Sequence, residues 1–290
     1  MKKIFLFLIN FLIITSCSTS PKNQSIQDLI RQGKIEEAKS YFSTKADINE
    51  QDAEGNTVLH IASIKNDEDL LTFLLIKGAN PEIKNYESKT PLMLAIENDC
   101  YDSVRVLTNA GANIFAKNID EKTTLELAIE KDEIFYDLII NEKTSKQKDD
   151  NGKTIIHYFV TSENYKALSF AIKKNLPIDE PDNNSVTPLK IALSNPQNYT
   201  YAKIANELLL AGAQEIKNET DYFQNSVIAR NYSLTLEDGQ TPLHYAAIKN
   251  HSGIAKFLLE NKAKTSAQDI NGSTPLHEAC RYGNIEIAKE

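Results

Sequence analysis

The sequence predicts an all-α protein in which short helix–turn–helix units stack side by side into an elongated solenoid. Three observations lead to this prediction. One six-residue phrase recurs at a nearly constant spacing, each copy opens with residues that begin helices, and each is followed by a second apolar stretch of helical length. A single unit of this kind cannot bury its apolar face alone, so stacking of neighbours completes the core.

The recurring phrase stands at TVLHIA (57–62), TPLMLA (90–95), TTLELA (123–128), TIIHYF (154–159), TPLKIA (187–192), TPLHYA (241–246) and TPLHEA (274–279). The steps are 33, 33, 31, 33, 54 and 33 residues. The phrase T-P-L-H-x-A at a period near 33 resembles the ankyrin repeat, and the resemblance covers the chain from about Ser25 to the end. It implies an ankyrin-repeat solenoid of helix–turn–helix units with finger-like β-hairpin loops.

The first helix of each unit is expected to begin at the threonine, because a threonine hydroxyl accepts a hydrogen bond from an amide of the first turn. Proline fits the next position, which needs no donor. Leu243 and Ala246 illustrate the buried face, with one large and one small side chain. Residue types that tolerate a left-handed turn follow and are expected to end this helix. They are Asn66, Asp99, Asp132, Asn250 and Gly283.

A second apolar stretch, seen in DLLTFLLIKGA (69–79) and HSGIAKFLLENKA (251–263), predicts a return helix. The residues expected to end it are Gly78, Gly111, Gly212 and Lys262. A finger-like loop then leads to the next threonine. Its turn glycine lies two places before the threonine, at Gly55, Gly152, Gly239 and Gly272.

The two ends of the repeat domain, 25–290, differ from its middle. Residues 25–52 show the two-helix rhythm without the phrase and are expected to form an N-terminal capping unit. The last copy stops at Glu290, before the Leu-Leu pair present at Leu74-Leu75 and Leu258-Leu259. We expect either a fragment of a longer protein, which is favoured, or a second chain that covers the apolar surface left open.

The first 24 residues are of another kind. Two lysines, an apolar run from Ile4 to Ile14 and small residues are typical of a secretory signal, and the run is too short for a permanent membrane helix. The sequence Ile14-Thr15-Ser16-Cys17 resembles a bacterial lipobox. That resemblance implies removal of residues 1–16, acylation of Cys17 and a tether over 17–24. The alternative is an ordinary signal with a coincidental cysteine. The expected location is the bacterial cell envelope, on the periplasmic face or at the outer membrane.

Residues able to carry chemistry do not form recognisable sites. The net charge is −8, so the chain lacks the positively charged surface that a general nucleic-acid-binding protein needs, and we predict no nucleic-acid partner. In the ankyrin family the histidine of the phrase is structural, bonding to nearby backbone and to the adjoining unit; here the positions are His60, His157, His244 and His277. Cys100 and Cys280 have no Cys or His at metal-ligand spacing and are expected to be free thiols. We predict no enzyme activity, metal, cofactor or small-molecule substrate.

Partner-binding candidates follow from the family, whose members contact partners through loop tips and the exposed face of the first helix. The corresponding positions are Ile64, Lys65, Tyr86, Glu87, Glu97, Asn98, Ile119, Asp120, Ile248, Lys249 and Ile270. Taken as a set, the apolar or aromatic residues among them indicate an interface, whereas any one of them alone is better explained as a surface residue without a role.

Three segments depart from the period. An insertion at about 218–234 adds candidates of hot-spot type, which are Tyr222, Phe223, Arg230 and Tyr232. We expect its deletion (219–233) to spare folding and abolish partner capture, unless the insertion packs on its own repeats. Extra residues also stand near 195–201. The 31-residue step predicts a local kink, and Tyr158-Phe159 replace x-Ala in the next copy, which argues against a tight helical approach there.

The function predicted from all of this is a membrane-anchored bacterial lipoprotein that acts as a protein–protein interaction scaffold. Two alternatives remain. The chain is the recognition arm of a longer protein with an effector or catalytic domain beyond residue 290, or it is a structural, self-associating envelope protein.

Overall fold

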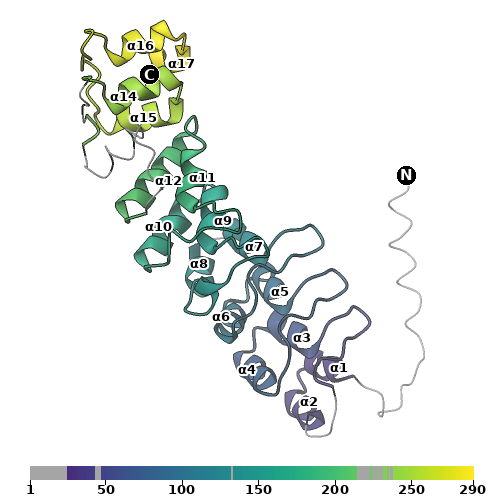
Figure 1. The fold of residues 1–290 in the computed structure, drawn as a ribbon. Helices are drawn as coiled ribbons and strands as arrows, with labels where there is room; N and C mark the ends of the chain where they lie inside the picture. The colour runs from purple at the N-terminus through teal and green to yellow at the C-terminus, as the bar shows by residue number, and fades with distance from the viewer. Residues whose placement is uncertain are drawn as a thin grey trace, which may run out of the picture.

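The computed structural model describes residues 25–42, 47–131, 133–213 and 238–290, together with 223, 227, 231–233 and 235. The chain forms an elongated stack of helix pairs (Figure 1). The predicted signal peptide, Cys17, the tether, Tyr222 and Arg230 lie outside the described residues. Within the described part, no helix has both the length and the apolar character needed to cross a membrane.

The helices form two rows, with the finger loops on the side of the first row (Figure 1). The first, inner row consists of α1 (Ile26–Arg31), α3 (Val58–Lys65), α5 (Pro91–Glu97), α7 (Thr124–Lys131), α9 (Ile155–Thr161), α11 (Pro188–Leu193), α14 (Pro242–Lys249) and α16 (Pro275–Arg281). The outer row consists of α2 (Ile35–Tyr41), α4 (Glu68–Ile76), α6 (Tyr101–Ala110), α8 (Glu133–Ile139), α10 (Tyr165–Lys173), α12 (Tyr199–Leu210), α15 (Ser252–Glu260) and α17 (Ile285–Lys289). A 3₁₀ turn, η1 (Thr144–Lys146), follows α8.

The predicted helix starts are confirmed. The Thr90 hydroxyl accepts a hydrogen bond from the Met93 N–H at 3.3 Å, and the Thr187 hydroxyl accepts one from the Lys190 N–H at 3.2 Å. Each bond satisfies one of the amides that the first turn leaves without a partner. The proline that follows occupies the first helical position in α5, α11, α14 and α16.

The predicted helix ends are confirmed as well, because the backbone enters the left-handed region where the sequence indicates it. Positive φ follows the inner helices at Asn66, Asp99, Asn250 and Gly283, and the outer helices at Gly78, Gly111, Gly212 and Lys262. Only glycine takes this conformation without strain, and asparagine and aspartate tolerate it best among the rest. Asp132 lies outside the described residues.

One continuous hydrophobic core runs through the stack, from Ile26 in α1 to Ile287 in α17. Leu59 and Ala62 on α3 show its construction, since both are 0% exposed. Full burial of a leucine side chain contributes roughly 1.5–3 kcal/mol relative to exposure. The alanine lets the neighbouring helix approach closely.

Six of the described fingers are closed by an Asp or Asn side chain rather than by a β-ladder. The Asp52 carboxylate accepts hydrogen bonds from the N–H groups of Glu54 and Asn56 at 3.0 and 2.8 Å. The same pair of bonds recurs at Asn85, Asn118, Asp149, Asp182 and Asp269.

The fingers are therefore turns, not the β-hairpins that the resemblance implied. In the described residues, β pairing is limited to one isolated antiparallel bridge between Lys117 and Thr123. The residue two places before the threonine has positive φ whether it is a glycine, such as Gly55 (φ 78°), or not, such as Glu121 (φ 60°). The turn geometry, rather than the residue type, is what the units share.

The described part of the insertion is built into the core. Phe223 and Val227 are 2% and 0% exposed. The rings of Phe223 and Tyr232 meet that of Phe257 on α15 edge to face, with centroids 5.8 and 5.7 Å apart, and the Tyr232 hydroxyl donates to the Asn206 side-chain oxygen on α12 at 3.0 Å. The expectation that residues 219–233 can be deleted without harm to the fold is wrong, because deletion would open this packing.

The extra residues near 195–201 also contact the next unit. The Ile254 N–H donates to the Pro196 carbonyl at 3.1 Å, and Gly253 lies against Asn198.

In the unit with the 31-residue step, a single residue separates α7 from α8, whereas three separate α5 from α6. The predicted loss of tight approach is confirmed: α7 and α9 have little direct contact, while α3 and α5 pack closely.

Candidate partner-binding surface

The finger tips carry the most exposed of the predicted contact residues. Tyr86 and Ile119 are 71% and 68% exposed and occupy equivalent positions in adjacent fingers, 33 residues apart. Ile270 has the same position in the last finger and is 74% exposed. The fingers with Asp150 and Asn183 at this position are polar. The apolar tips thus gather in the N-terminal half of the stack, with one more at its far end.

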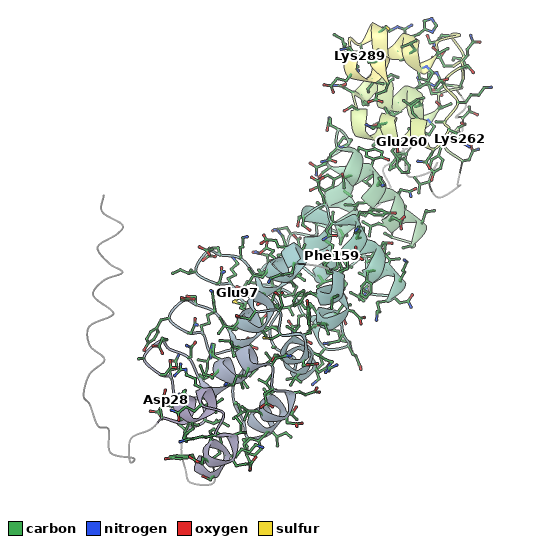
Figure 2. All side chains as sticks on the ribbon, turned by 180° about the vertical axis from the view of Figure 1, so that it is seen from behind. Asp28, Glu97, Phe159, Glu260, Lys262 and Lys289 are labelled. Atoms are coloured by element: carbon green, nitrogen blue, oxygen red, sulfur yellow. The ribbon has the colours of Figure 1, made fainter. Side chains whose placement is uncertain are left out.

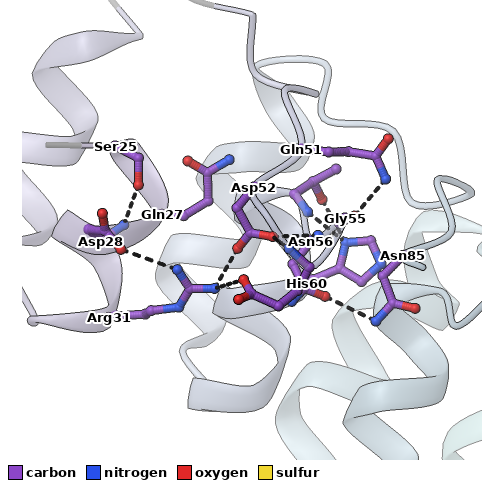
Figure 3. Close-up of polar contacts among 12 residues, drawn as sticks. Ser25, Gln27, Asp28, Arg31, Gln51, Asp52, Gly55, Asn56, His60 and Asn85 are labelled. Carbon is purple, nitrogen blue, oxygen red and sulfur yellow. Dashed lines mark hydrogen bonds and ion pairs between the residues drawn. The ribbon is translucent and has the colours of Figure 1, made fainter. Parts of the chain in front are cut away.

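Contacts between units hold Tyr86 against the first finger; Figure 3 shows Gln51, Asn56 and Asn85, which take part in them. The Gln51 side chain donates to the Lys84 carbonyl at 2.9 Å, and Asn85 donates to the Asn56 side chain at 3.0 Å. The Tyr86 ring lies across Gly55, where an added Cβ would come within 2.7 Å of it. Glycine at position 55 therefore permits both the turn and this close approach.

Arg31 of the first helix pair fixes the base of the same finger (Figure 3). Its guanidinium pairs with Asp52 and lies 3.6 Å from Glu54 and 3.2 Å from Asp28. Partial burial works to raise the pKa of Asp52, but the hydrogen bonds from Asn56, Arg31 and Glu54 outweigh it and hold this pKa below its usual range. The Asp52 carboxyl group that closes the finger turn is thus kept ionised.

Acidic side chains flank the apolar tips. Glu87 and Asp120 follow Tyr86 and Ile119 directly, and both are exposed. Lys89 pairs with Glu97 at 2.9 Å and with Glu87 at 3.0 Å. Both pairs raise the pKa of Lys89, and the pair with Glu97 has the larger effect. An apolar tip with acids beside it suits a partner surface that is apolar and rimmed by basic groups.

The exposed face of the inner helices contributes fewer contact residues than predicted. Ile64 is 42% exposed and Lys65 is exposed, as the candidates require. Ile248 is half-buried, and the Lys249 ammonium lies 5.9 Å from the centre of the Tyr245 ring. The structure therefore brings Ile64, Tyr86 and Ile119 into neighbouring units but leaves Ile248 and Ile270 in the distant last two units.

Two candidates in the insertion need correction. Phe223 is 2% exposed, so its ring is part of the core and is removed from the candidate surface. Tyr232 is half-buried by its contact with Phe257. Aromatic residues are common both in buried cores and in interfaces, so the residue types alone could not show whether the insertion packs on its own repeats or contacts a partner.

The predicted structural role of the phrase histidines is confirmed. His60 Nδ1 accepts from the Thr57 N–H at 3.0 Å, and Nε2 donates to the Lys89 carbonyl of the next unit at 3.0 Å. His157 and His244 repeat both bonds. Burial lowers the pKa of His60 and of His157.

The remaining polar chemistry is sparse. Both predicted thiols are free: Cys280 is exposed, and Cys100 is buried with Sγ 3.3 Å from the Ile64 carbonyl. Burial raises the pKa of the Cys100 thiol. Across the described residues, no cluster of three or more His, Cys, Asp and Glu side chains is arranged to hold a metal ion.

Exposed apolar side chains lie in the last unit, where the sequence predicts open apolar surface, although no individual contact candidate is named there. Leu276, Tyr282 and Ile285 are 55%, 55% and 64% exposed, and Leu276 and Ile287 line a cavity of about 150 Å³. The signal that points to it is the shortness of the last return helix.

The fold defines a stacked helical-repeat protein, with exposed apolar side chains at three of its finger tips. The family described as "Ankyrin repeats (3 copies)" matches residues 22–118, 125–221 and 216–290, so the chain belongs to the ankyrin-repeat family.

Curated relatives agree with this assignment. The human "SH3 and multiple ankyrin repeat domains protein 2" is 38% identical over 71 residues, which are 24% of this chain and 4% of that protein. The "Putative ankyrin repeat protein FPV223" of fowlpox virus is 29% identical over 139 residues, 48% of this chain and 82% of that protein. The chain thus spans only a small part of the human relative. A crystal structure of the ankyrin repeat domain of Bcl-3 has 21% identity and a TM-score of 0.46, and covers 82% of this chain and 100% of that one.

Proposed function

We propose that this chain is a protein-binding scaffold whose contact surface centres on the finger tips at Tyr86 and Ile119, with Ile64 beside them. The observation that carries the proposal is the exposure of two large apolar side chains, 71% and 68%, at equivalent positions of adjacent fingers. A solvated turn has no folding reason to keep such residues, because hydration favours polar side chains there. Membership of the ankyrin-repeat family, a family of interaction scaffolds, supports the same function.

The partner that fits this surface has an apolar patch edged with lysine or arginine. Glu87 and Asp120 supply the opposite charge, and together with Glu54 they form a row of acids along three successive fingers. Such rim charges add more to the association rate than to the final affinity.

We further propose that the chain is tethered to a bacterial envelope membrane through acyl chains on Cys17. The run Ile14-Thr15-Ser16-Cys17 after a short apolar segment supports this. Two or more acyl chains anchor firmly because each buried CH₂ contributes about 0.8 kcal/mol. The replacement Cys17→Ala should move the protein from the membrane fraction to the soluble fraction; continued pelleting with membranes would place the anchor elsewhere.

Photo-crosslinking from the finger tips tests the scaffold function. A photoreactive phenylalanine derivative replaces Tyr86 or Ile119 in the full chain in its native cell, and cross-linked products are identified by mass spectrometry. Ile76 on α4 is the matched control, because it is apolar and 78% exposed but lies on an outer helix.

We expect the same partner to be captured from positions 86 and 119 and not from position 76. Competition by excess unlabelled chain should abolish the product, whereas competitor carrying Tyr86→Asp and Ile119→Asp should not. Equal capture from all three positions, or no product from either tip, would refute the assigned surface.

A further inference from the structure

Successive units are joined in two different ways, which differ in whether two specific hydrogen bonds are present. At the α3/α5 junction, His60 Nε2 donates to the Lys89 carbonyl at 3.0 Å, and the Tyr86 N–H donates to the Glu54 carbonyl at 3.2 Å. The first bond joins helix to finger and the second joins neighbouring finger tips. A junction with both bonds is called locked below.

The same two bonds occur together at two further junctions. At α9/α11 they join His157 to Val186 at 2.9 Å and Asn183 to Asn151 at 2.8 Å. At α14/α16 they join His244 to Ser273 at 3.0 Å and Ile270 to Asp238 at 2.9 Å. The inner helices of all three locked junctions are closely packed.

Other junctions lack the lock. Met93, Glu126 and Lys190 replace the histidine on α5, α7 and α11. Methionine has no donor, and a carboxylate only accepts, so Met93 and Glu126 cannot reproduce the bond to the next finger. Among the described fingers, no backbone hydrogen bond joins the tip at 118–122 to the tips on either side, at 85–89 and 149–153.

The α7/α9 junction combines these absences with little direct contact between its inner helices and little contact between α8 and α10. Phe159, 0% exposed, stands where other units have alanine, and its ring contacts Tyr136 of α8 at a centroid distance of 6.2 Å. A ring in the place of a methyl group holds the inner helices apart. Figure 2 shows Phe159 midway along the stack. Across the outer row, Lys166–Glu133 and Lys174–Asp137 are exposed ion pairs, a class that adds little stability because solvent screens the charges.

An open gap between two fingers accompanies this junction. Cavities of about 430 and 280 Å³ share Lys117, Asp149 and Asn151 in their linings. The smaller cavity also borders Glu121, whereas the larger one extends to Glu82 and Lys84 before the preceding finger. Space on this scale allows the tips to approach or separate without collision. The base of the gap remains joined, because the Gln147 side chain donates to the Gly111 and Ala112 carbonyls at 3.1 and 3.0 Å.

We infer that the α7/α9 junction is a hinge. The units up to α8 and the units from α9 onward change their relative angle about the contacts of Gln147, Phe159 and Tyr136, and the gap between the two fingers opens and closes. Three contacts that are present at every locked junction are missing together here: the histidine bond, the finger-tip bond and the close inner-helix packing. The hinge depends only on contacts within the chain and stands whether or not the finger tips bind a partner.

Distances between finger tips test the hinge. Spin labels are attached to paired cysteines at equivalent exposed positions of the full chain, in which Cys17, Cys100 and Cys280 have been replaced. Asp120→Cys with Asn151→Cys spans α7/α9, and Asn151→Cys with Asn184→Cys spans the locked α9/α11 junction. We expect a longer mean distance and a broader distribution for the first pair. Equal, narrow distributions would overturn the hinge.

Restoring the lock tests its cause. Glu126 Oε2 accepts from the Thr123 N–H at 2.8 Å, the bond that histidine Nδ1 makes elsewhere. Glu126→His keeps that bond and adds a donor facing the next finger, so the 120–151 distribution should narrow. Glu126→Met, which has a similar length and no donor, as at Met93 of α5, is the control and should leave it broad. A distribution unchanged by histidine would overturn the assignment to the missing bond.

The unaltered chain offers a second measurement. By hydrogen exchange, the N–H groups of Tyr86, Asn183 and Ile270 should be protected, whereas that of Asp150, whose equivalent bond would cross the α7/α9 junction, should exchange faster. Equal protection at all four positions would also overturn the proposal.

Discussion

At the residue scale, the phrase histidine joins two units because its ring nitrogens face in opposite directions. His157 Nδ1 accepts from the Thr154 N–H at 3.1 Å, which leaves the proton on Nε2. Nε2 donates to the Val186 carbonyl at 2.9 Å. An apolar side chain of similar size would fill the space but leave that amide and that carbonyl buried without partners, which costs free energy.

We therefore expect His157→Ala to lower the free energy of unfolding by about 2–4 kcal/mol, from two lost hydrogen bonds and a small cavity. His277→Ala is the matched control. His277 makes the same local bond to Thr274, but its ring is exposed. Its loss should cost about 1 kcal/mol or less. Urea titration followed by circular dichroism measures both, and equal losses would contradict the bridging role.

Stability should also depend on pH through the buried histidines. Burial lowers the pKa of His60 and His157 in the folded state, so the unfolded chain binds protons first as pH falls. Their contribution is complete above about pH 6.5, the unfolded value, and is lost as pH drops below it. Unfolding free energies measured between pH 5 and 8 should show this decline. The double variant His60→Asn/His157→Asn should show a flatter profile; an unchanged slope would assign the decline to other groups.

At the element scale, α15 shows how an irregular loop is absorbed by its neighbour. Gly253 lies in the first turn of α15, and a Cβ there would stand 2.3 Å from the Asn198 carbonyl carbon. The next residue, Ile254, donates to Pro196. The longer corner between α11 and α12 is thus seated on the start of α15, and glycine is the residue that permits it.

Gly253→Ala is expected to destabilise the fold by about 1–3 kcal/mol through overpacking, although the same change in an open helix stabilises by up to about 1 kcal/mol. Ser252→Ala, one residue earlier, is the control; it removes only an exposed 3.3 Å bond to the Gln197 carbonyl. Thermal unfolding of both variants decides the matter. A stabilised Gly253→Ala would show that the corner moves away easily.

The helices could be predicted because each carries its own local signals. A threonine cap, a proline in the first turn and an Asn or Gly at the end act within one unit, so spacing alone places them. The burial of Phe223 could not be predicted, since the insertion has no period to set an inward face. The exposure of Tyr86 and Ile119 was predictable from the turn, but their role in binding stays a prediction.

The gap between two fingers was also beyond the sequence, although the Tyr158-Phe159 departure pointed to the right place. Whether the tips at 118–122 and 149–153 bond depends on the relative placement of two units. That placement follows from helix packing and not from either finger. A sequence pattern indicates the conformation of a residue in its own turn, but it does not indicate whether two turns from different units form a hydrogen bond with each other.

At the scale of the whole molecule, the stack should not unfold as one unit. Repeat proteins are stabilised by contacts between neighbours, so a weak junction limits cooperativity. Leu59 on α3 and Leu243 on α14 are 0% and 3% exposed and lie on opposite sides of the α7/α9 junction. Replacement of either by alanine costs about 2–5 kcal/mol locally.

We expect each replacement to move only the transition of its own side, seen as separate shifts by hydrogen exchange and mass spectrometry during urea unfolding. A single transition that both variants shift equally would indicate full cooperativity across the junction.

Because some junctions are locked and others are not, the chain behaves mechanically as springs of unequal stiffness joined end to end. Under a pull applied at its two ends, every junction carries the same force, and the softest one stretches most. The gap beside Phe159 would therefore take up the first extension while the locked pairs α3/α5, α9/α11 and α14/α16 keep their shape. A tension too small to unfold any helix would be read out as a change in the spacing of two fingers.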